Sequence, residues 1–262
     1  MPELPEVETV RRQLQKILVG QRIKKIEKFH PKSLQGSTLQ VVGKKILRVR
    51  RKAKRIIIEL NGGESLLIHL KMTGQLIYNG KKNKHTRAIF ELDKGKLFFN
   101  DLRKFGWIKI VKNQALKECL VKLPLDVVDK EFTVKYLEKV LKSSKRAIKL
   151  VLLDQSKIGG LGNIYVNESL FCAGVNPSTP ANKVKQIKEL HRCIKEVINK
   201  AIKFGGTTSA DESFKNALGK PGKFQNYLKV YENKGKCDKC QTKIRKIKIG
   251  GRGTYYCPKC QL

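Results

Sequence analysis

The fold class of the first half of the chain is indicated by the stretch Arg55-Ile56-Ile57-Ile58-Glu59-Leu60-Asn61-Gly62-Gly63-Glu64-Ser65-Leu66-Leu67-Ile68-His69-Leu70. Two short aliphatic runs flank Asn61-Gly62-Gly63, which is typical of a tight hairpin turn. A second pair of runs, residues 87–92 and 96–100, flanks Asp93-Lys94-Gly95 in the same way. Short strands with regular turn signals predict an antiparallel sandwich or barrel over residues 22–111.

Helices are predicted before and after these strands. Pro5, followed by Glu6 and Glu8, is typical of a helix start, because proline loses no hydrogen bond there and acids complement the helix dipole. The apolar residues that follow share one helical face and stop before Gly20: Val7, Val10, Leu14, Ile17 and Leu18. From residue 114 onward the pattern becomes helical, and residues 209–223 form a candidate mobile loop because their periodicity is weak. We therefore predict an α+β fold.

The charge balance indicates the partner. The chain has 262 residues, 57 of them Lys or Arg and 22 Asp or Glu, for a net charge of +35. Such a surplus predicts a polyanionic partner, with nucleic acid ahead of a membrane surface. No apolar run reaches the ~18 residues of a membrane span, and acids and prolines occupy the start where a signal peptide would be basic and apolar. We therefore expect a soluble, cytoplasmic protein.

Four of the seven cysteines predict a metal site. Cys237-x2-Cys240 and Cys257-x2-Cys260 are separated by sixteen residues, a spacing typical of zinc ribbons. A pair of disulfides is the alternative, and it is disfavoured in a chain without a secretion signal. We expect one structural Zn²⁺ that holds the tail together. The other three, Cys119, Cys172 and Cys193, are predicted to be reduced packing residues.

The first residues of the chain suggest covalent chemistry. A Met followed by the small Pro2 is expected to be removed, which would leave a secondary α-amine at the terminus. Its pKa near ~8 leaves roughly a tenth of it as free base at neutral pH. Such an amine forms a positively charged iminium, and Glu3 and Glu6 place two carboxylates nearby. The alternative is an ordinary helix start without catalysis.

Two further motifs have a functional and a structural interpretation. Gly159, Gly160, Gly162 and Asn163 join two helical runs, which is compatible with a phosphate-binding turn or with a simple helix–helix turn. Met72, Arg103 and Phe105 follow predicted strands. There they could enter a base stack as wedges or belong to the core.

Seven segments, in this order, resemble those of bacterial formamidopyrimidine-DNA glycosylases. They are Pro2-Glu3-Leu4-Pro5-Glu6-Val7-Glu8-Thr9, His69-Leu70-Lys71-Met72-Thr73-Gly74, Arg103-Lys104-Phe105-Gly106, Gly160-Leu161-Gly162-Asn163-Ile164-Tyr165, Gly205-Gly206-Thr207-Thr208, Gly219-Lys220-Pro221-Gly222 and the four-cysteine tail. Each is weak alone, but the ordered set covers essentially the whole chain and is highly specific.

The resemblance implies a bifunctional base-excision repair enzyme that removes oxidised purines such as 8-oxoguanine and formamidopyrimidines and then cleaves the strand as an abasic-site lyase. The implied domains are a catalytic helix and β-sandwich (1–112), a connecting segment (113–132), a helix-two-turn-helix domain (133–225) and a zinc-finger hairpin (226–262). Damaged double-stranded DNA would lie in the cleft between the two main domains. We expect a nucleoid-associated monomer.

The resemblance also implies residue roles. Pro2 would attack C1′ of the damaged nucleotide, and Glu3 would act as the acid/base that opens the sugar ring. Lys54 matches a family lysine for phosphate contact and β-elimination, and Arg252 matches the zinc-hairpin arginine linked to δ-elimination. Glu6 and Lys149 would support the active site, Lys149 near the damaged base. The expected DNA contacts are His69, Met72, His85, Arg103, Phe105, Lys145 and Asn163. Alignment leaves Ser144 or Lys145 for one family lysine.

Two alternatives stay open. Endonuclease VIII-type glycosylases share the fold, the N-terminal proline and the zinc but prefer oxidised pyrimidines. They typically begin Pro-Glu-Gly-Pro-Glu, so Leu4 favours the purine branch. A non-catalytic basic zinc-ribbon protein that binds nucleic acid would explain the charge and the cysteines, but not the N-terminal motif.

Overall fold

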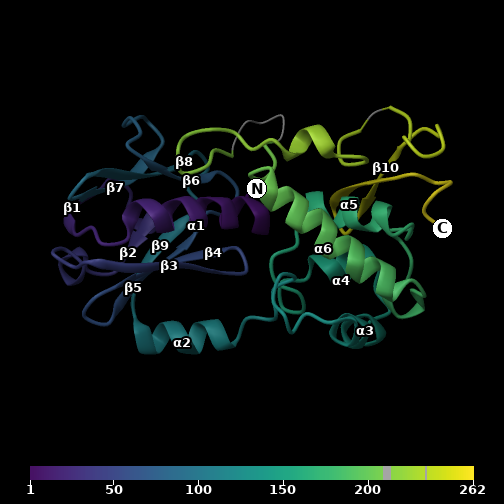
Figure 1. The fold of residues 1–262 in the computed structure, drawn as a ribbon, viewed down its shortest axis with the longest axis horizontal. Helices are drawn as coiled ribbons and strands as arrows, with labels where there is room; N and C mark the ends of the chain where they lie inside the picture. The colour runs from purple at the N-terminus through teal and green to yellow at the C-terminus, as the bar shows by residue number, and fades with distance from the viewer. Residues whose placement is uncertain (209–213, 234) are drawn as a thin grey trace. The chain divides into compact units, whose positions relative to one another are not determined.

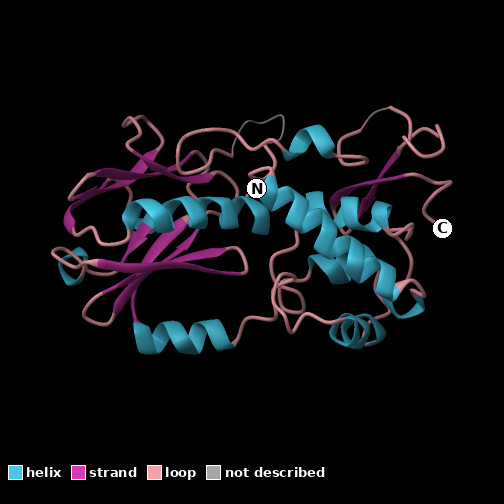
Figure 2. Ribbon diagram, in the orientation of Figure 1, coloured by secondary structure: helices cyan, strands magenta, loops and turns pink. Residues whose placement is uncertain are grey.

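The computed structural model describes residues 1–208, 214–233 and 235–262 (Figure 1). Contacts divide the chain into two compact units. One contains Met1–Lys122 and Ile202–Gln225, and the other contains Leu123–Ala201 and Asn226–Leu262. Figure 2 shows strands in both units and helices beside them. None of the helices in the described ranges combines the length and the hydropathy that crossing a bilayer requires.

Helix α1 (Leu4–Leu18) begins as the sequence predicts, with Pro5 in its first turn and Glu3 as its N-cap. Most of its apolar face is buried, since Val7, Val10 and Leu14 have no exposed surface and Ile17 is partly buried. Figure 1 shows α1 between two sheets of the first unit. The helix is therefore a core element, and the packing of its apolar face in this core holds its first residues in place.

The strands form two sheets within the described part of the first unit. One sheet has the order β1 (Ile23–Lys28), β7 (Thr86–Leu92), β8 (Gly95–Asp101), β6 (Gly74–Tyr78), and it is antiparallel throughout. The other has the order β2 (Leu34–Gln35), β9 (Trp107–Lys112), β5 (Glu64–His69), β4 (Arg55–Leu60), β3 (Ile46–Lys52), with β2 parallel to β9. Two short 3₁₀ turns, Pro31–Ser33 and Thr38–Gln40, accompany β2.

Both predicted hairpins are confirmed. Strands β4 and β5 pair in a register that places Arg55 opposite His69 and Ile58 opposite Leu66, and Leu92 of β7 pairs with Gly95 of β8. The inner faces of both sheets and α1 share one hydrophobic core, which includes Val10, Ile56, Ile58, Phe90 and Phe99. On the outer face of the second sheet, α2 (Asn113–Val121) buries Leu116 against Ile57 and Leu67.

The segment Ile202–Gln225 packs with the first unit, which differs from the predicted 133–225 domain. Phe214 and Ala217 are buried in the sandwich core. Ala217 N donates to Gln13 Oε1 at 2.9 Å, and Ala217 O accepts from Tyr78 N at 2.8 Å. Of the predicted mobile loop, residues 209–213 lie outside the described residues, and 214–223 is tied to the sandwich by these contacts.

The second unit is helical with a terminal hairpin. Its elements are α3 (Val134–Lys142), α4 (Ile148–Leu153), α5 (Asn163–Cys172), a 3₁₀ turn (Ala181–Lys183), α6 (Ile187–Lys203), a 3₁₀ turn (Phe224–Tyr227), β10 (Arg245–Ile249) and β11 (Arg252–Tyr256). The last residues of α6 and the first of the second 3₁₀ turn belong to the first unit.

The expectation that Cys172 and Cys193 are reduced is wrong in the structure, which joins them in a disulfide. Cys172 ends α5, and Cys193 lies on the buried face of α6, so packing of the two helices brings their Cα atoms to 5.7 Å. That distance lies within the range a disulfide requires. Sequence spacing gave no signal for this pair, because it forms only when the helices pack. Cys119 is free.

Glu168 of α5 anchors the chain that leads into the terminal hairpin. This carboxylate is 4% exposed. It accepts hydrogen bonds from the backbone N–H groups of Lys229, Val230 and Tyr231, at 2.8, 3.0 and 2.8 Å. Three donors compensate a buried carboxylate for the loss of water.

Replacing Glu168 by Gln should therefore destabilise the protein. The amide has one acceptor oxygen in place of two and turns an NH₂ group toward at least one of the three backbone donors, which predicts a loss of about 2 kcal/mol. Urea denaturation would measure this loss. Glu196→Gln is the matched control, since Glu196 forms an exposed pair with Arg192 and should change stability by less than about 0.5 kcal/mol. Equal effects of the two variants would contradict the anchor role.

Candidate functional site

The N-terminal carboxylates hold the start of α1 in one geometry. The side chain of Glu3 accepts from the backbone N–H of Glu6, and Glu6 Oε2 accepts from Glu3 N at 2.7 Å. This reciprocal capping box satisfies two donors at the helix start. Both carboxylates are almost completely buried, with 2% and 1% of their surface exposed, and Pro2 is buried beside them. Pro2 is thus attached to a rigid helix end.

The second oxygen of Glu6 reaches a segment two hundred residues away in sequence. Glu6 Oε1 accepts from Thr207 N at 2.7 Å. Gly206 has a φ of +81°, and a Cβ there would lie 2.7 Å from the same oxygen. Only glycine permits both that conformation and that approach. Glu6 therefore joins the start of α1 to the Gly205-Gly206-Thr207-Thr208 motif.

Lys54 lies in the turn between β3 and β4, and the structure ties this turn to α1. Ala53 adopts a left-handed φ of 50°, and its carbonyl accepts from Arg51 Nη1 at 2.9 Å. The same guanidinium donates from Nε to Glu8 Oε2 at 3.0 Å. Burial raises the pKa of Glu8, but hydrogen bonds from Arg11 and Arg12 and the charge of Arg51 outweigh it and hold the pKa below its ordinary value. Glu8 therefore stays ionised and keeps the turn in place.

A salt bridge between Arg51 and Glu8 was not predicted from the sequence. A salt bridge between residues 43 positions apart leaves no local signal in the sequence. The bridge is almost buried, with 8% and 10% of the two side chains exposed. It is one contact that relates the Lys54 turn to the helix that follows Pro2.

The predicted wedge side chains lie on the surface and not in the core. Met72 is 36% exposed and Phe105 is 53% exposed. Arg103 is also exposed, and its guanidinium carbon lies 4.8 Å from the centre of the Phe105 ring. These positions disfavour the core interpretation. His85, another expected DNA contact, is half-buried just before β7.

His69 ends β5 and is neutral in the folded protein. Its Nδ1 accepts from Lys71 N at 3.0 Å, which leaves the ring proton on Nε2. Burial disfavours the imidazolium form, and the charges of Lys71, Arg55 and Lys54 add to this, lowering the pKa of His69 to about 3.

In the second unit, Lys149 and Asn163 meet at the tip of the terminal hairpin. Lys149 Nζ donates to Gly253 O at 2.7 Å and to Thr254 Oγ1 at 2.8 Å, and Asn163 Nδ2 donates to Gly253 O at 3.1 Å. Lys149 is completely buried. Both residues therefore fix the strand that begins with Arg252, whose side chain is exposed.

This contact adds a structural role for Lys149 to the expected one near a damaged base, which stays a prediction. Lys145 is exposed after α3, and Ser144 Oγ accepts from Arg146 N at 3.3 Å. Of the two residues that could match the family lysine, only Lys145 carries a charge.

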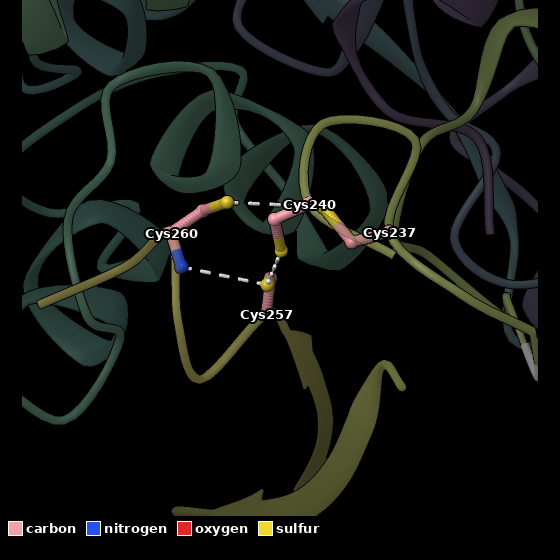
Figure 3. A group of neighbouring side chains, drawn as sticks. All are labelled: Cys237, Cys240, Cys257 and Cys260. Carbon is pink, nitrogen blue, oxygen red and sulfur yellow. Dashed lines mark hydrogen bonds between the residues drawn. The ribbon is translucent and has the colours of Figure 1, made fainter. Parts of the chain in front are cut away.

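The four predicted zinc ligands form one cluster (Figure 3). Their sulfur atoms all lie within 4.8 Å of one another, with Cys237 Sγ 3.9 Å from Cys260 Sγ and Cys240 Sγ 3.4 Å from Cys257 Sγ. Tetrahedral zinc with Zn–S bonds of ~2.3 Å needs sulfurs ~3.8 Å apart. The cluster fits that ion, and the bound metal would join the knuckle before β10 to the one after β11. The predicted structural zinc site is confirmed.

Comparisons with known proteins agree with this arrangement. Residues 1–108 match the family model of the formamidopyrimidine-DNA glycosylase N-terminal domain, residues 123–213 match the H2TH domain of the same glycosylase, and residues 234–262 match a zinc finger found in FPG and IleRS.

A formamidopyrimidine-DNA glycosylase of Pelotomaculum thermopropionicum is 41% identical over all of this chain and 99% of its own length. The structure superimposes on the MutM (Fpg) protein of Thermus thermophilus with a TM-score of 0.92 at 36% identity, covering 99% of this chain and 98% of that one. It superimposes equally well, at 0.92 and 37% identity with 99% of both chains covered, on Lactococcus lactis Fpg in complex with DNA containing N7-benzyl-Fapy-dG.

The zinc site predicts how metal content responds to mutation. The purified protein should contain about one zinc per chain, and Cys257→Ala should lose it, because three thiolates bind zinc far more weakly than four. Metal analysis by mass spectrometry would measure this, with Cys119→Ala as the control outside the cluster. Zinc-free protein with disulfides among the four cysteines would contradict the assignment.

The lowered pKa of His69 predicts a stability difference in mild acid. From about pH 6.5 down to about 3, the unfolded chain binds a proton at this residue that the folded chain does not, so stability is lost as the pH falls. At pH 5.5 the loss should be about 1 kcal/mol. Denaturation of the wild type and His69→Gln between pH 7.5 and 5 would compare the slopes, and the variant should lose less stability. Parallel slopes would contradict the prediction.

Proposed function

Because the chain belongs to the formamidopyrimidine-DNA glycosylase family, we propose that it removes oxidised purines from double-stranded DNA through an imine at Pro2 and then cleaves the strand at the abasic site. It is a base-excision repair glycosylase. The observation that carries the proposal is the rigid N-terminus, where Glu3 and Glu6 fix the helix start next to Pro2.

In the first step, the Pro2 nitrogen forms a bond to C1′ as the bond from C1′ to the damaged base breaks. The electron pair of that bond leaves with the base, which takes up the proton that the Pro2 nitrogen loses. Loss of Met1 is required, since only the free secondary amine has a lone pair for this attack. Glu3 is next to Pro2 and protonates the ring oxygen, so that the sugar opens and the positive iminium forms. Glu3 is adjacent to Pro2 in the chain, and a carboxyl group positioned at the reacting atoms is a common general acid.

In the second step, the iminium acidifies the C2′–H bond. A base removes this proton, the electron pair forms the C2′–C3′ double bond, and the 3′ phosphate leaves. A second elimination releases the 5′ phosphate in the same way. Lys54 and Arg252 would bind these phosphates, because cations stabilise the negative charge that the leaving groups develop.

Access to C1′ requires that the damaged nucleotide leave the base stack. Met72, Arg103 and Phe105 are the side chains we propose to fill the gap. The exposed Phe105 ring provides an apolar wedge, and the guanidinium group of Arg103 beside it provides a positive charge that attracts the DNA phosphates. Unstacking costs a few kcal/mol per step, and phosphate contacts offset it.

The expected DNA contacts include residues of both units. His69 and His85 belong to the first, and Lys145, Asn163 and Arg252 to the second. If six or more phosphates are neutralised, affinity should fall by ~10³ or more between low and moderate salt. We propose that the protein acts as a monomer and that its charge of +35 keeps it associated with the nucleoid.

A second substrate is needed to determine which branch of the family the protein belongs to, because the two branches prefer different damaged bases. Leu4 and the proposed wedge favour oxidised purines over the oxidised pyrimidines of endonuclease VIII-type enzymes. Duplexes with 8-oxoguanine or thymine glycol, cleaved in parallel, would separate the branches. The purine duplex should be cleaved faster.

Borohydride trapping tests the imine. Reduction during turnover should link the native protein covalently to a duplex with 8-oxoguanine opposite cytosine. Pro2→Gly with an uncleaved N-terminal tag should give no adduct, because the nitrogen of residue 2 is then a peptide amide and not a free amine. Glu3→Gln should lower the trapping rate by ~10² or more, since it removes the proposed acid/base.

Absence of an adduct with the native protein would make the proposal wrong. Equal trapping by the tagged Pro2→Gly protein would show that a lysine and not Pro2 forms the imine. A non-catalytic DNA-binding protein would bind the duplex without cleaving it, so product analysis on the same samples separates this alternative.

A further inference from the structure

Two surface loops of the first unit share one buried anchor, Asp101. This last residue of β8 has no exposed surface. Its Oδ1 accepts from Thr73 Oγ1 at 2.5 Å and from Arg103 N at 3.2 Å. Its Oδ2 accepts from Gly106 N at 2.6 Å. One carboxylate therefore binds the loop after β5 and both ends of the loop after β8.

Thr73 links the same two loops a second time. Its hydroxyl group donates to Asp101 and accepts from Arg103 N at 3.0 Å. The hydroxyl is thus oriented by the carboxylate, which makes its lone pair available to Arg103. Met72 precedes Thr73 directly, so the position of one proposed wedge residue depends on the position of another.

The backbone of Asp101 extends the anchor to a third segment. Asp101 N donates to His85 O at 2.9 Å, and Asp101 O accepts from Arg87 Nε at 2.9 Å. His85 is an expected DNA contact from a different part of the sequence. Two of the expected DNA contacts, His85 and Arg103, are therefore hydrogen-bond partners of Asp101. Two others, Met72 and Phe105, directly precede its partners Thr73 and Gly106.

The loop conformations need such an anchor. Lys71 and Lys104 are not glycines, yet they have left-handed φ values of 53° and 60°. Conformations of this kind persist only where the surroundings enforce them. Gly106 is packed so closely that a Cβ would lie 3.0 Å from Asp101 Oδ2 and 3.0 Å from the Phe99 ring, and a Cβ at Gly74 would lie 2.4 Å from Leu70 O.

We propose that Asp101 is a positioning residue that, together with Thr73, holds Met72, Arg103 and Phe105 in the conformation that enters the base stack. It touches neither the sugar nor the base, and it governs extrusion of the nucleotide and not the imine chemistry. This inference rests on the proposed insertion of those side chains. The physical reason is preorganisation, since loops that are already ordered lose little conformational entropy on entering the stack.

Two variants test this role. Asp101→Asn has the same shape but turns an NH₂ group toward donors, which releases at least one of the bound groups. Thr73→Val removes the hydroxyl bridge and leaves the carboxylate with its two backbone donors. Ser65→Ala is the matched control, because Ser65 lies in β5 of the other sheet and is also completely buried. Its hydroxyl donates to Asn113 Oδ1, at the start of α2, at 2.8 Å.

The experiment compares a substrate that must be unstacked with one that need not be. The first is a duplex with 8-oxoguanine opposite cytosine and a 2-aminopurine next to the lesion, whose fluorescence rises on unstacking. The second is a single-stranded oligonucleotide with an abasic site. Asp101→Asn should slow the fluorescence rise and base excision on the duplex by ~10²-fold, the loss expected for a misplacement of about 1 Å. Borohydride trapping on the single strand should stay within about threefold of the wild type.

Thr73→Val should slow the fluorescence rise and duplex excision by ~10-fold, the effect of about 1.4 kcal/mol. Ser65→Ala should change neither substrate. If Asp101→Asn does not fold, the rates of Thr73→Val on the duplex and on the single strand can still be compared with those of Ser65→Ala. Wild-type fluorescence kinetics in the folded variants would overturn the inference, and so would equal losses on the duplex and the single strand.

Failure of the proposed function has a different signature. If the wild type traps on neither substrate, the imine at Pro2 is wrong. The 2-aminopurine signal still reports unstacking in that case, so the role of Asp101 is tested independently of the chemistry.

Discussion

The hydrogen bonds of Glu6 are the constraint on which the proposed active site depends. One oxygen caps the helix start at Glu3, and the other binds Thr207 from the segment that returns to the sandwich. The helix itself is immobilised by its buried apolar face. A nucleophile at a chain terminus would otherwise be mobile, and attack on one carbon requires that it be held. The fold therefore holds the residue that carries the proposed nucleophile next to a fixed helix start.

A wider pattern follows from the excess of basic residues. With 57 basic and 22 acidic residues, carboxylates are scarce, and several of them are buried where they organise backbone. Glu3 and Glu6 form the capping box, Glu8 holds the Lys54 turn through Arg51, and Glu168 holds the entry to the zinc hairpin. Asp101 holds the loops of the proposed wedge. These buried acids are bound to donors, and on the surface the cations that a phosphate backbone attracts outnumber the remaining acids.

Local patterns predicted the parts of the molecule that local chemistry determines. The hairpin after Leu60 follows from Asn61-Gly62-Gly63, the first helix from Pro5 and its apolar spacing, and the zinc ligands from two Cys-x2-Cys pairs. The ordered motifs predicted the family. The return of Ile202–Gln225 to the sandwich was not predicted, because Phe214 and Ala217 pack against residues more than a hundred positions away. The Cys172–Cys193 disulfide was missed because it forms only when α5 and α6 pack together.

The sequence was sufficient for the element types, the metal ligands and the identity of the candidate nucleophile. The element types and the Cys-x2-Cys pairs depend on residues within a few positions of one another, and the nucleophile was identified from the ordered set of motifs. Folding in three dimensions assigned the partners of the buried polar groups. Nothing near Asp101 in the sequence indicates that its carboxylate binds Thr73, and nothing near Lys149 indicates that its ammonium group binds Gly253. A buried charge must find donors or acceptors wherever the packed chain supplies them. Those partners are set by distances in space, and a sequence does not contain them as a pattern.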